Sequence, residues 1–228
     1  MVKSADIICD SSSLISLADS CLLPTLKTIK EHLDGGVFIS PRVEHESVTR
    51  PMGIKEYSLA ALRIRQAIAD GTLTLIEGRR SDQETNQILE HSNRVYSIGN
   101  RPMRILHEGE AEMLALADEL GIGNILMDER TTRMLSEYPE GLRKHYVKEF
   151  GKEVRVSEGD LRWFARLTKD MNIFRSSEVV VVAYELGYFK KYRGMESQML
   201  EAALYALKFA GCGITFDEIR EFTEKGRV

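Results

Sequence analysis

The sequence predicts an α/β fold with three layers, α/β/α, around a central parallel sheet of about five strands, with further helices at the C-terminal end. Short apolar runs of strand length alternate with longer segments of helical spacing. Such alternation is typical of a parallel sheet that is covered by helices on both faces. The hydrophobic fraction of 43% supplies residues for a buried core, and the charged fraction of 29% is ordinary for a soluble domain.

The predicted elements follow from strand-length apolar runs and from helix start and stop signals. The first strand ends at Asp10 and is followed by Ser11-Ser12-Ser13, a helix-starting cluster. The second strand is followed by Ser40-Pro41, an N-cap with proline at the first helical position. The strands are expected at 5–9, 37–39, 72–76, 124–127 and 154–156, the helices from about 14 and at 25–33, 54–69, 81–96, 110–120 and 130–135, and a loop at 99–106.

The pattern changes near Ser157. We expect residues 1–157 to form the α/β core and residues 158–228 to form a helical extension, which packs on the core or forms a homodimer interface. The four valines at 179–182 have strong β propensity and make the second helix of the extension the least secure. The apolar stripe at 200–207 is expected to contribute to self-association. The extension is expected to have helices at 161–167, 178–186, 197–209 and 216–223.

Charge and cysteine content exclude several classes of protein. The net charge of −4, from 31 Lys+Arg against 35 Asp+Glu, excludes a uniformly basic nucleic-acid binder but leaves room for a local basic patch. The three cysteines are widely spaced and form no C-x-x-C, which argues against a disulfide framework or a zinc site and favours a reducing cytoplasm. No apolar run approaches the roughly 20 residues that span a bilayer, and no signal peptide is expected.

Acidic residues follow two of the predicted strands directly. Asp10 ends the run Ile7-Ile8-Cys9, and Asp128 ends the run Ile125-Leu126-Met127. In open α/β sheets, ligands bind beyond the carboxyl ends of the strands. The alternative is that both aspartates only cap the helices that follow, a role that suits Asp. The strand pattern by itself leaves these two interpretations equally weighted.

Two glutamates are candidates for the same edge of the sheet. Glu110 shares a helical face with Met113, Leu114 and Ala117, so it is expected at the head of an apolar stripe rather than in bulk water. Glu112 lies on another face and is expected to be solvated. Glu46 follows the second strand, and either a functional role or plain surface exposure fits its position.

Four segments in this order resemble a PIN domain, a small α/β/α nuclease fold. They are ICDSSSLISLA at 8–18, ISPRVEHE at 39–46, GEAEMLALADELG at 109–121 and ILMDERTTRML at 125–135, and the resemblance covers about residues 5–157. It implies a divalent-metal-dependent endoribonuclease, toxin-like or RNA-processing, in which Asp10, Glu46, Glu110 and Asp128 are catalytic and bind Mg²⁺ or Mn²⁺. Ser12 matches the small hydroxyl near the first acid. Hard oxygen ligands of this kind suit these ions rather than zinc.

The chain departs from the family pattern at the last acid. Many relatives have Thr-x-Asp at this strand end, whereas this chain has Met127-Asp128-Glu129, so Asp128 and Glu129 compete for the role. Asp128 is preferred because it directly ends the apolar run. The resemblance implies RNA as a partner, a homodimer, and a cognate inhibitor protein as a further candidate. Among the arginines, Arg42, Arg79 and Arg80 are the candidates for RNA contact at the site, with Arg101 and Arg104 further along the chain.

Two other function classes remain as alternatives. The missing threonine is compatible with a non-catalytic PIN-like module that binds RNA or a protein partner. A phosphoacceptor α/β domain that uses Asp10 or Asp128 is disfavoured because serines follow Asp10 where a second acid would be needed. P-loop, Rossmann and G-x-S-x-G signatures are absent from the sequence.

Overall fold

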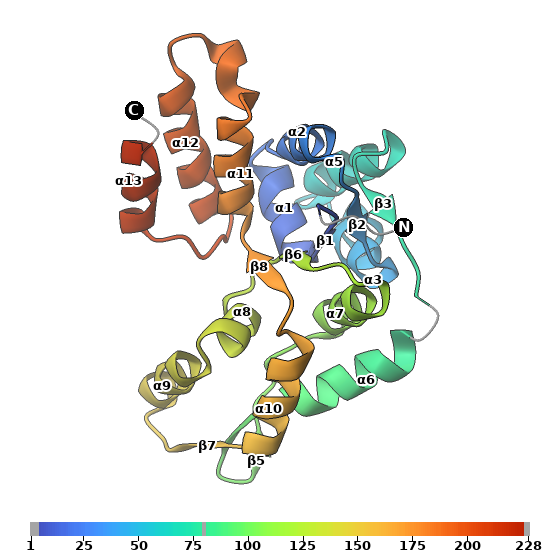
Figure 1. The fold of residues 1–228 in the computed structure, drawn as a ribbon, viewed down its shortest axis with the longest axis vertical. Coiled ribbons are helices and arrows are strands. Elements are labelled where there is room, and N and C mark those ends of the chain that lie inside the picture. Colours follow the sequence, from blue (N-terminus) through green and yellow to red (C-terminus); the bar gives the residue numbers. More distant parts are fainter. Residues whose placement is uncertain (1–4, 79–80, 226–228) are drawn as a thin grey trace.

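The central sheet is parallel and has five strands, which confirms the predicted three-layer α/β/α fold. The structure is a computed structural model and describes residues 5–78 and 81–225 (Figure 1). The strand order is β3-β2-β1-β6-β8, and every neighbouring pair is parallel. These strands are β1 (Ile7–Cys9), β2 (Val37–Ile39), β3 (Thr74–Leu75), β6 (Asn124–Leu126) and β8 (Asn172–Phe174).

Helices cover both faces of this sheet and extend the molecule at its two ends (Figure 1). The first half of the chain contributes α1 (Ser11–Asp19), α2 (Pro24–Leu33), α3 (Pro41–Glu44), the π-helical turn η1 (His45–Thr49), α4 (Arg50–Met52) and α5 (Ser58–Ala69). The middle contributes α6 (Ser81–Ser92), α7 (Glu108–Leu120), α8 (Arg130–Glu137), α9 (Pro139–Phe150) and α10 (Glu158–Leu167). The last part contributes α11 (Ser176–Glu185), the 3-10 turn η2 (Tyr188–Tyr192), α12 (Glu196–Phe209) and α13 (Phe216–Lys225).

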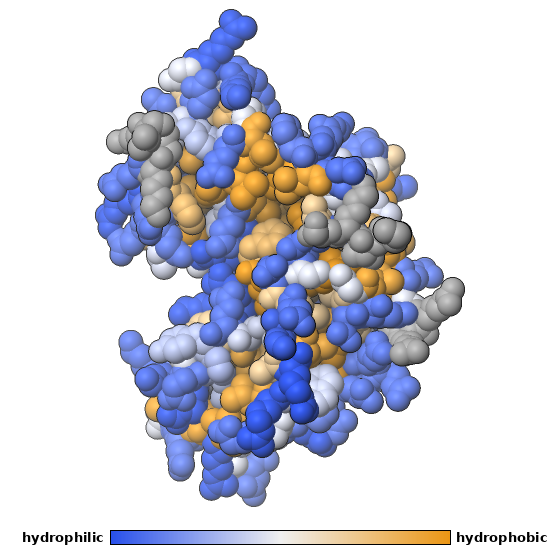
Figure 2. All heavy atoms as spheres, in the orientation of Figure 1, coloured by the Kyte–Doolittle hydropathy of each residue, from blue (hydrophilic) through white to orange (hydrophobic). Residues whose placement is uncertain are grey.

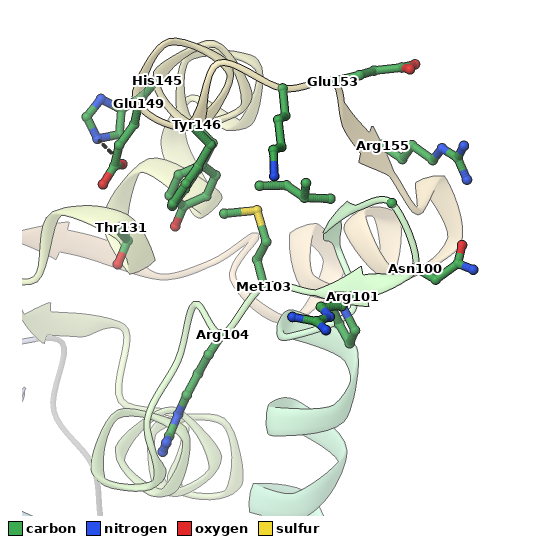
Figure 3. Close-up of a pocket in the computed structure, with 15 residues that line it drawn as sticks. Asn100, Arg101, Met103, Arg104, Thr131, His145, Tyr146, Glu149, Glu153 and Arg155 are labelled. Carbon is green, nitrogen blue, oxygen red and sulfur yellow. Dashed lines mark ion pairs between the residues drawn. The ribbon is translucent and has the colours of Figure 1, made fainter.

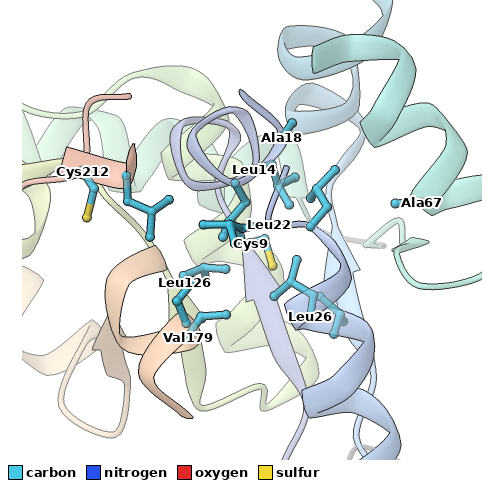
Figure 4. Packing of buried hydrophobic residues seen from close by; sticks show 14 of the residues in the cluster. Cys9, Leu14, Ala18, Leu22, Leu26, Ala67, Leu126, Val179 and Cys212 are labelled. Atoms are coloured by element: carbon cyan, nitrogen blue, oxygen red, sulfur yellow. The ribbon is translucent and has the colours of Figure 1, made fainter. Parts of the chain in front are cut away.

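Alternation along the strands creates two separate cores. Cys9 of β1 and Leu126 of β6 face the helices α1 and α11, where they pack near Leu14 and Val179 (Figure 4). Ile8, between Ile7 and Cys9, belongs to the other core, which is built around α7. Because successive side chains of a strand point to opposite faces, a strand buried on both sides reads as an unbroken apolar run. This burial explains why β1 and β6 are recognisable in the sequence although each has only three residues.

The strand expected at 154–156 forms, but not in the central sheet, so its assignment to that sheet is wrong. As β7 (Val154–Val156) it pairs antiparallel with β4 (Tyr96–Ile98), which also pairs with β5 (Arg101–Pro102). The loop expected at 99–106 therefore contains half of a hairpin, and the helix expected to reach residue 96 ends at Ser92. Asn93 fixes this arrangement, because its amide accepts from the N–H groups of Ile105 and Leu106 at 2.6 and 2.9 Å.

The fifth strand of the central sheet comes from the segment after residue 157. β8 pairs with β6 in parallel, with Asn124 opposite Asn172 and Leu126 opposite Phe174. The run Asn172-Ile173-Phe174 is too short, and too polar at its start, to stand out in the sequence. A boundary at residue 157 separates β8 from the sheet that it completes, so the last third of the chain supplies part of the α/β core as well as helices.

The four helices expected after residue 157 are all present. The valine-rich segment forms α11 because tertiary packing overrides β propensity: Val179, Val180 and Ala183 are buried against the core. The stripe that we expected to mediate self-association is covered within the chain, since α12 buries Leu200, Ala203, Leu204 and Leu207 in the same core. This stripe therefore supplies no dimer interface.

Arg175 ties the last helix to the head of α11. The Arg175 side chain is 8% exposed, and its Nη2 lies 2.9 Å from Oε1 of Glu218 in α13 and 3.4 Å from Oε1 of Glu178 in α11. Both acids hold the pKa of Arg175 above its usual value against the opposing effect of burial. A buried cation with two carboxylates fixes the position of the α11 N-terminus.

The surface carries scattered apolar groups and one larger apolar area. Figure 2 shows apolar side chains gathered over α2 and α11, where Leu33 and Val182 remain exposed. Within the described ranges, no helix is long and apolar enough to cross a membrane. Cys9, Cys21 and Cys212 are free thiols.

Truncation after Ser157 tests the role of β8. The fragment 1–157 loses the strand that pairs with β6 and the α11 face that covers Cys9 and Leu126, so we expect an insoluble or molten chain without a cooperative thermal transition. Calorimetry and light scattering on the fragment and on the full chain check this. A monodisperse fragment that melts cooperatively would contradict it and would show that the C-terminal helices are a separable module.

Candidate active site

Asp10 is buried at the carboxyl end of β1, where it caps α1. The residue is 2% exposed, and its carboxylate accepts hydrogen bonds from the backbone N–H of Ser12 and Ser13 and, at 2.9 Å, from the Ser12 hydroxyl. The sequence favours this arrangement because Asp is a preferred N-cap and the serines that follow are small. The hydrogen bonds from α1 partly offset the cost of burying the charge.

Asp128 is buried at the end of the neighbouring strand and contacts the head of another helix. It is 4% exposed, and it accepts from the N–H of Ser176 at 2.8 Å and from the Ser176 hydroxyl at 2.6 Å. Ser176 is the first residue of α11. The register aligns Cys9 with Leu126, and Asp10 N donates to Leu126 O at 2.9 Å. Both aspartates therefore lie at the same edge of the sheet.

Glu46 reaches this edge from the π-helical turn η1. Its Oε2 accepts from the Ser11 hydroxyl at 2.9 Å, which joins η1 to the start of α1. The carboxylate lies over Gly109 of α7, where a Cβ would be 2.7 Å from Oε2. Only glycine leaves room for Glu46 in this position. Single π-helical turns of this kind are frequent at functional sites.

Glu110 lies in the first turn of α7 and links that helix to α8. Its Oε2 accepts from the N–H of His107 at 2.7 Å, and its Oε1 accepts from the Thr132 hydroxyl at 3.1 Å. The position at the head of α7 agrees with the expected one. The Thr132 contact brings α8, which begins immediately after Asp128 and Glu129, against the N-terminus of α7.

Burial and neighbouring carboxylates raise the pKa values of Asp10 and Glu110. Burial raises the pKa of Asp10 to about 8, and the charges of Glu110 and Asp128 add to this effect, while the hydrogen bonds from Ser12 and Ser13 oppose it. Burial likewise raises the pKa of Glu110 to about 7, with further contributions from Glu129 and Glu46. The electrostatic field therefore couples the four expected acids, and Glu129 with them. A cluster of like charges in a dry site disfavours full ionisation.

Ser12 and Glu129, the two supporting residues, have local roles in the structure. Ser12 holds Asp10, as described above. Glu129 caps α8, and its Oε1 accepts from Thr131 N–H at 3.1 Å and from the Thr131 hydroxyl at 2.7 Å. Asp128 acts on Asp10 and Glu129 acts on Glu110, so both residues of the pair belong to the acidic edge.

Of the three arginines expected to contact RNA, the structure describes Arg42. Arg42 joins α3 to α7: its Nη1 lies 2.6 Å from Glu108 Oε2, and its Nε lies 3.5 Å from Glu112 Oε1. Arg79 and Arg80 lie outside the described residues. The expectation that Glu112 is solvated is wrong, since it is 7% exposed and accepts from Arg42 N–H at 2.9 Å. Glu112 is buried because α7 is covered on more than one side. Its charge is favourable there because it lies beside the N-terminus of α3.

Several partners of these acids were not anticipated: Ser11, Gly109, Thr132 and Ser176. The sequence contains one usable signal for them, because Ser176 opens a helix in the segment RSSE and a serine there can reach an acid at the neighbouring strand end. The contacts of Gly109 and Thr132 depend on how α7 meets η1 and α8. No local pattern encodes that packing.

The donor chemistry of this edge suits a hard divalent cation. Carboxylate and hydroxyl oxygens surround it, as Mg²⁺ and Mn²⁺ prefer. Over residues 5–78 and 81–225, no three His, Cys, Asp or Glu side chains converge closely enough to hold a metal ion. Burial raises the pKa values of Asp10 and Glu110, and neighbouring carboxylates add to the effect, so a bound cation would favour the ionised forms of these two acids. The residues therefore fit such a cation in the chemistry of their donor atoms.

The fold and this acidic edge define a PIN-type protein, and a comparison with protein families agrees. The DUF3368 family model, described as a PIN domain, matches residues 6–142. That range exceeds half of the chain, so the chain belongs to the PIN-domain family, whose fold is nuclease-like. No curated protein and no solved structure matches the chain. The family match ends within α9, before β8 and the C-terminal helices.

The titration of Asp10 predicts a specific dependence of stability on pH. The folded-state pKa of about 8 exceeds the usual value near 4, so the free energy of unfolding has no Asp10 penalty below about pH 4 and acquires it as the pH rises to about 8. Asp10→Asn removes the charge but keeps an N-cap acceptor. We expect the free energy of unfolding of the variant, relative to that of the wild type, to increase by up to about 1.4 kcal/mol per pH unit over this interval.

Urea unfolding of both proteins in EDTA, at several pH values between 4 and 8, measures this difference. A stability difference that stays constant across the interval, or a variant that becomes less stable relative to the wild type as the pH rises, would contradict the electrostatic account. Asp10 would then be a purely structural cap.

Proposed function

We propose that this chain is a divalent-metal-dependent endoribonuclease in which Asp10, Glu46, Glu110 and Asp128 hold Mg²⁺ or Mn²⁺. The observation that carries the proposal is the electrostatic coupling of buried carboxylates at the carboxyl edge of a PIN-domain sheet. Uncompensated buried acids cost stability. Binding of a cation by these acids would explain why the site contains them despite this cost.

The surrounding residues support the proposal by orienting each acid. Ser12 and Ser13 fix Asp10, Ser176 fixes Asp128, and Ser11 fixes Glu46. Such outer partners hold carboxylate ligands in position. A bound divalent cation would supply activation of water and stabilisation of the leaving oxygen in phosphodiester cleavage. No covalent nucleophile from the protein is required, and Ser11–Ser13 act as helix-cap and orienting residues.

The alternative function is a non-catalytic PIN-like module that binds RNA or a protein. It is favoured by Met127, which stands where many relatives have threonine, and by the two aspartates, whose oxygens already accept from helix N-termini. Both functions use the same fold. They differ in whether the acids are needed for a metal-dependent reaction.

Cleavage assays separate the two functions. Asp10→Asn and Asp128→Asn should each lower Mn²⁺-dependent cleavage of a fluorescent oligoribonucleotide by more than roughly 100-fold, because each removes a proposed metal ligand. Glu108→Gln is the matched control. This acid lies at the head of the same helix as Glu110, but it is exposed and pairs only with Arg42 among the ion pairs described.

Wild-type cleavage that EDTA abolishes, with the control variant near wild type, supports the nuclease. If the wild type binds the oligoribonucleotide but does not cleave it with either ion, the non-catalytic module is correct. If Asp10→Asn retains all activity, Asp10 is not an essential metal ligand and the proposed site is refuted.

Gly109 provides an independent test of Glu46. A Cβ at this position would lie within 2.8 Å of both Glu46 carboxylate oxygens, so Gly109→Ala should push the carboxylate aside. Because that side chain is flexible and alanine favours helix, we expect unfolding stability equal to wild type or up to about 1 kcal/mol higher. The Mn²⁺ concentration needed for half-maximal cleavage should rise.

Gly159→Ala is the control, since this glycine also lies in the first turn of a helix but has nothing within 4 Å of a Cβ. Its Mn²⁺ requirement should stay at the wild-type value. A Gly109→Ala enzyme with an unchanged Mn²⁺ requirement would remove Glu46 from the proposed ligands.

A further inference from the structure

A large hollow on the molecule lies beside the acidic edge rather than within it. It is a groove of about 1090 Å³ between the β4–β5 hairpin and α9, with β7 at one side. Figure 3 shows Met103 on the hairpin side pointing toward Tyr146 of α9, with Arg101 further along the hairpin. The volume is at the upper end for small-molecule pockets, and the lining combines apolar side chains with several charged ones.

Four cations line this groove: Arg101, Arg104, Lys152 and Arg155. All four are exposed. None of them forms an ion pair with a carboxylate among the described residues, in contrast to Arg42, Arg143 and Arg175. The lining also contains two acids, of which Glu149 lies 3.5 Å from His145. The groove is therefore locally positive on a chain whose net charge is −4.

An aromatic side chain accompanies these cations. Phe150, at the end of α9, is 46% exposed, and its ring centroid lies 6.1 Å from that of the buried Tyr146. One edge of the Phe150 ring thus rests on the core while the rest is available to a ligand. A positive groove with an accessible aromatic ring is the usual arrangement for binding single-stranded nucleic acid, whose phosphates and bases it engages separately.

The groove connects directly to the acidic edge through α8. Thr131 lines the groove, and its N–H and hydroxyl both donate to Glu129. The next residue, Thr132, donates to Glu110. Two adjacent residues of α8, Thr131 and Thr132, thus connect the groove to the carboxylates. A nucleic-acid chain bound in the groove would lie next to the acidic edge.

We propose that this groove binds a single-stranded nucleic acid next to the acidic edge, with Arg101, Arg104, Lys152 and Arg155 at its phosphates and Phe150 stacked on a base. The identification of the strand as RNA substrate rests on the proposed nuclease function; the binding itself does not. The ladder β5-β4-β7 and α9 then act as a substrate-binding unit beside the central sheet.

The test is fluorescence anisotropy of the full chain in EDTA, where the proposed cleavage cannot occur. The probes are labelled oligouridylate and oligothymidylate of about 12 nucleotides, a length within the range that one binding module covers. Arg101→Glu combined with Lys152→Glu reverses one cation on each side of the groove. Lys190→Glu with Arg193→Glu is the matched control, because it makes the same charge change at η2, at the opposite end of the molecule (Figure 1).

We expect the groove double variant to bind roughly 10-fold more weakly or worse, with the slope of log Kd against log salt reduced by about 1.4, or 0.7 for each lost phosphate contact. The control double variant should keep the wild-type slope. Phe150→Ala should weaken binding by roughly 5- to 100-fold with the slope unchanged, as expected for one stacked base. Phe209→Ala, which removes a 77% exposed ring on α12, should have no effect.

Weaker binding of either oligonucleotide by the groove double variant supports the proposal. If the wild type binds oligouridylate more tightly than oligothymidylate, the groove also prefers RNA. Equal binding by the groove and control double variants would overturn the proposal. The proposal would also be overturned if a labelled oligoglutamate bound the wild type as tightly as the oligonucleotides and no longer bound the groove double variant. The groove would then be a site for acidic polypeptide.

The outcomes for the groove and for the nuclease are separable. Specific binding by a wild-type chain that never cleaves leaves the groove supported and refutes the nuclease. Wild-type cleavage by the groove double variant, together with wild-type binding, leaves the nuclease supported and overturns the groove.

Discussion

Asp10 and Asp128 are buried with like charge at the ends of adjacent strands, and each is compensated by the N-terminus of a helix. This compensation fixes where α1 and α11 begin. Because α11 belongs to the last third of the chain, the acidic edge depends on β8 and on the Arg175 contacts that hold the α11 head. Helix N-termini offset only part of the cost, as the raised pKa of Asp10 shows. The remaining imbalance is what a divalent cation would relieve.

The same edge organises the more distant parts of the molecule. Glu46 and Glu110 come from elements that pack against α1 and α8, so the four acids bring together segments from both halves of the family-matched region. α8 faces two ways, toward the acids through Thr132 and toward the cationic groove through Thr131. The acidic edge repels phosphates until cations neutralise it. The adjacent groove offers the positive charge that the edge itself lacks.

Sequence patterns predicted the central strands β1, β2, β3 and β6 and the helices that follow them. In β1 and β6, burial on both faces leaves unbroken apolar runs, and serine or proline marks the helix starts after β1 and β2. β3 is exposed, and the stop signal of the helix before it marked its position. Sequence patterns failed where pairing is decided at long range. β7 and β8 are both three-residue segments, and nothing local tells that the first pairs antiparallel with β4 while the second completes the parallel sheet. Among site residues, strand ends indicated Asp10 and Asp128, whereas the burial of Glu112 and the room that Gly109 leaves for Glu46 arise from packing of α7 against α3 and η1.

The claim that this edge is a metal centre is tested most directly by a crystal structure of the chain soaked in Mn²⁺, with anomalous scattering to locate the ion. The account predicts an anomalous peak bonded to carboxylate oxygens of Asp10 and Asp128, with Glu46 or Glu110 drawn in to complete the shell. Metal–oxygen distances should be roughly 2.0–2.6 Å. The hydrogen bonds from Ser12 and Ser176 should persist and orient the ligands. A map with no peak at this edge, while the aspartates keep their helix contacts unchanged, would contradict the account and leave these acids as structural caps.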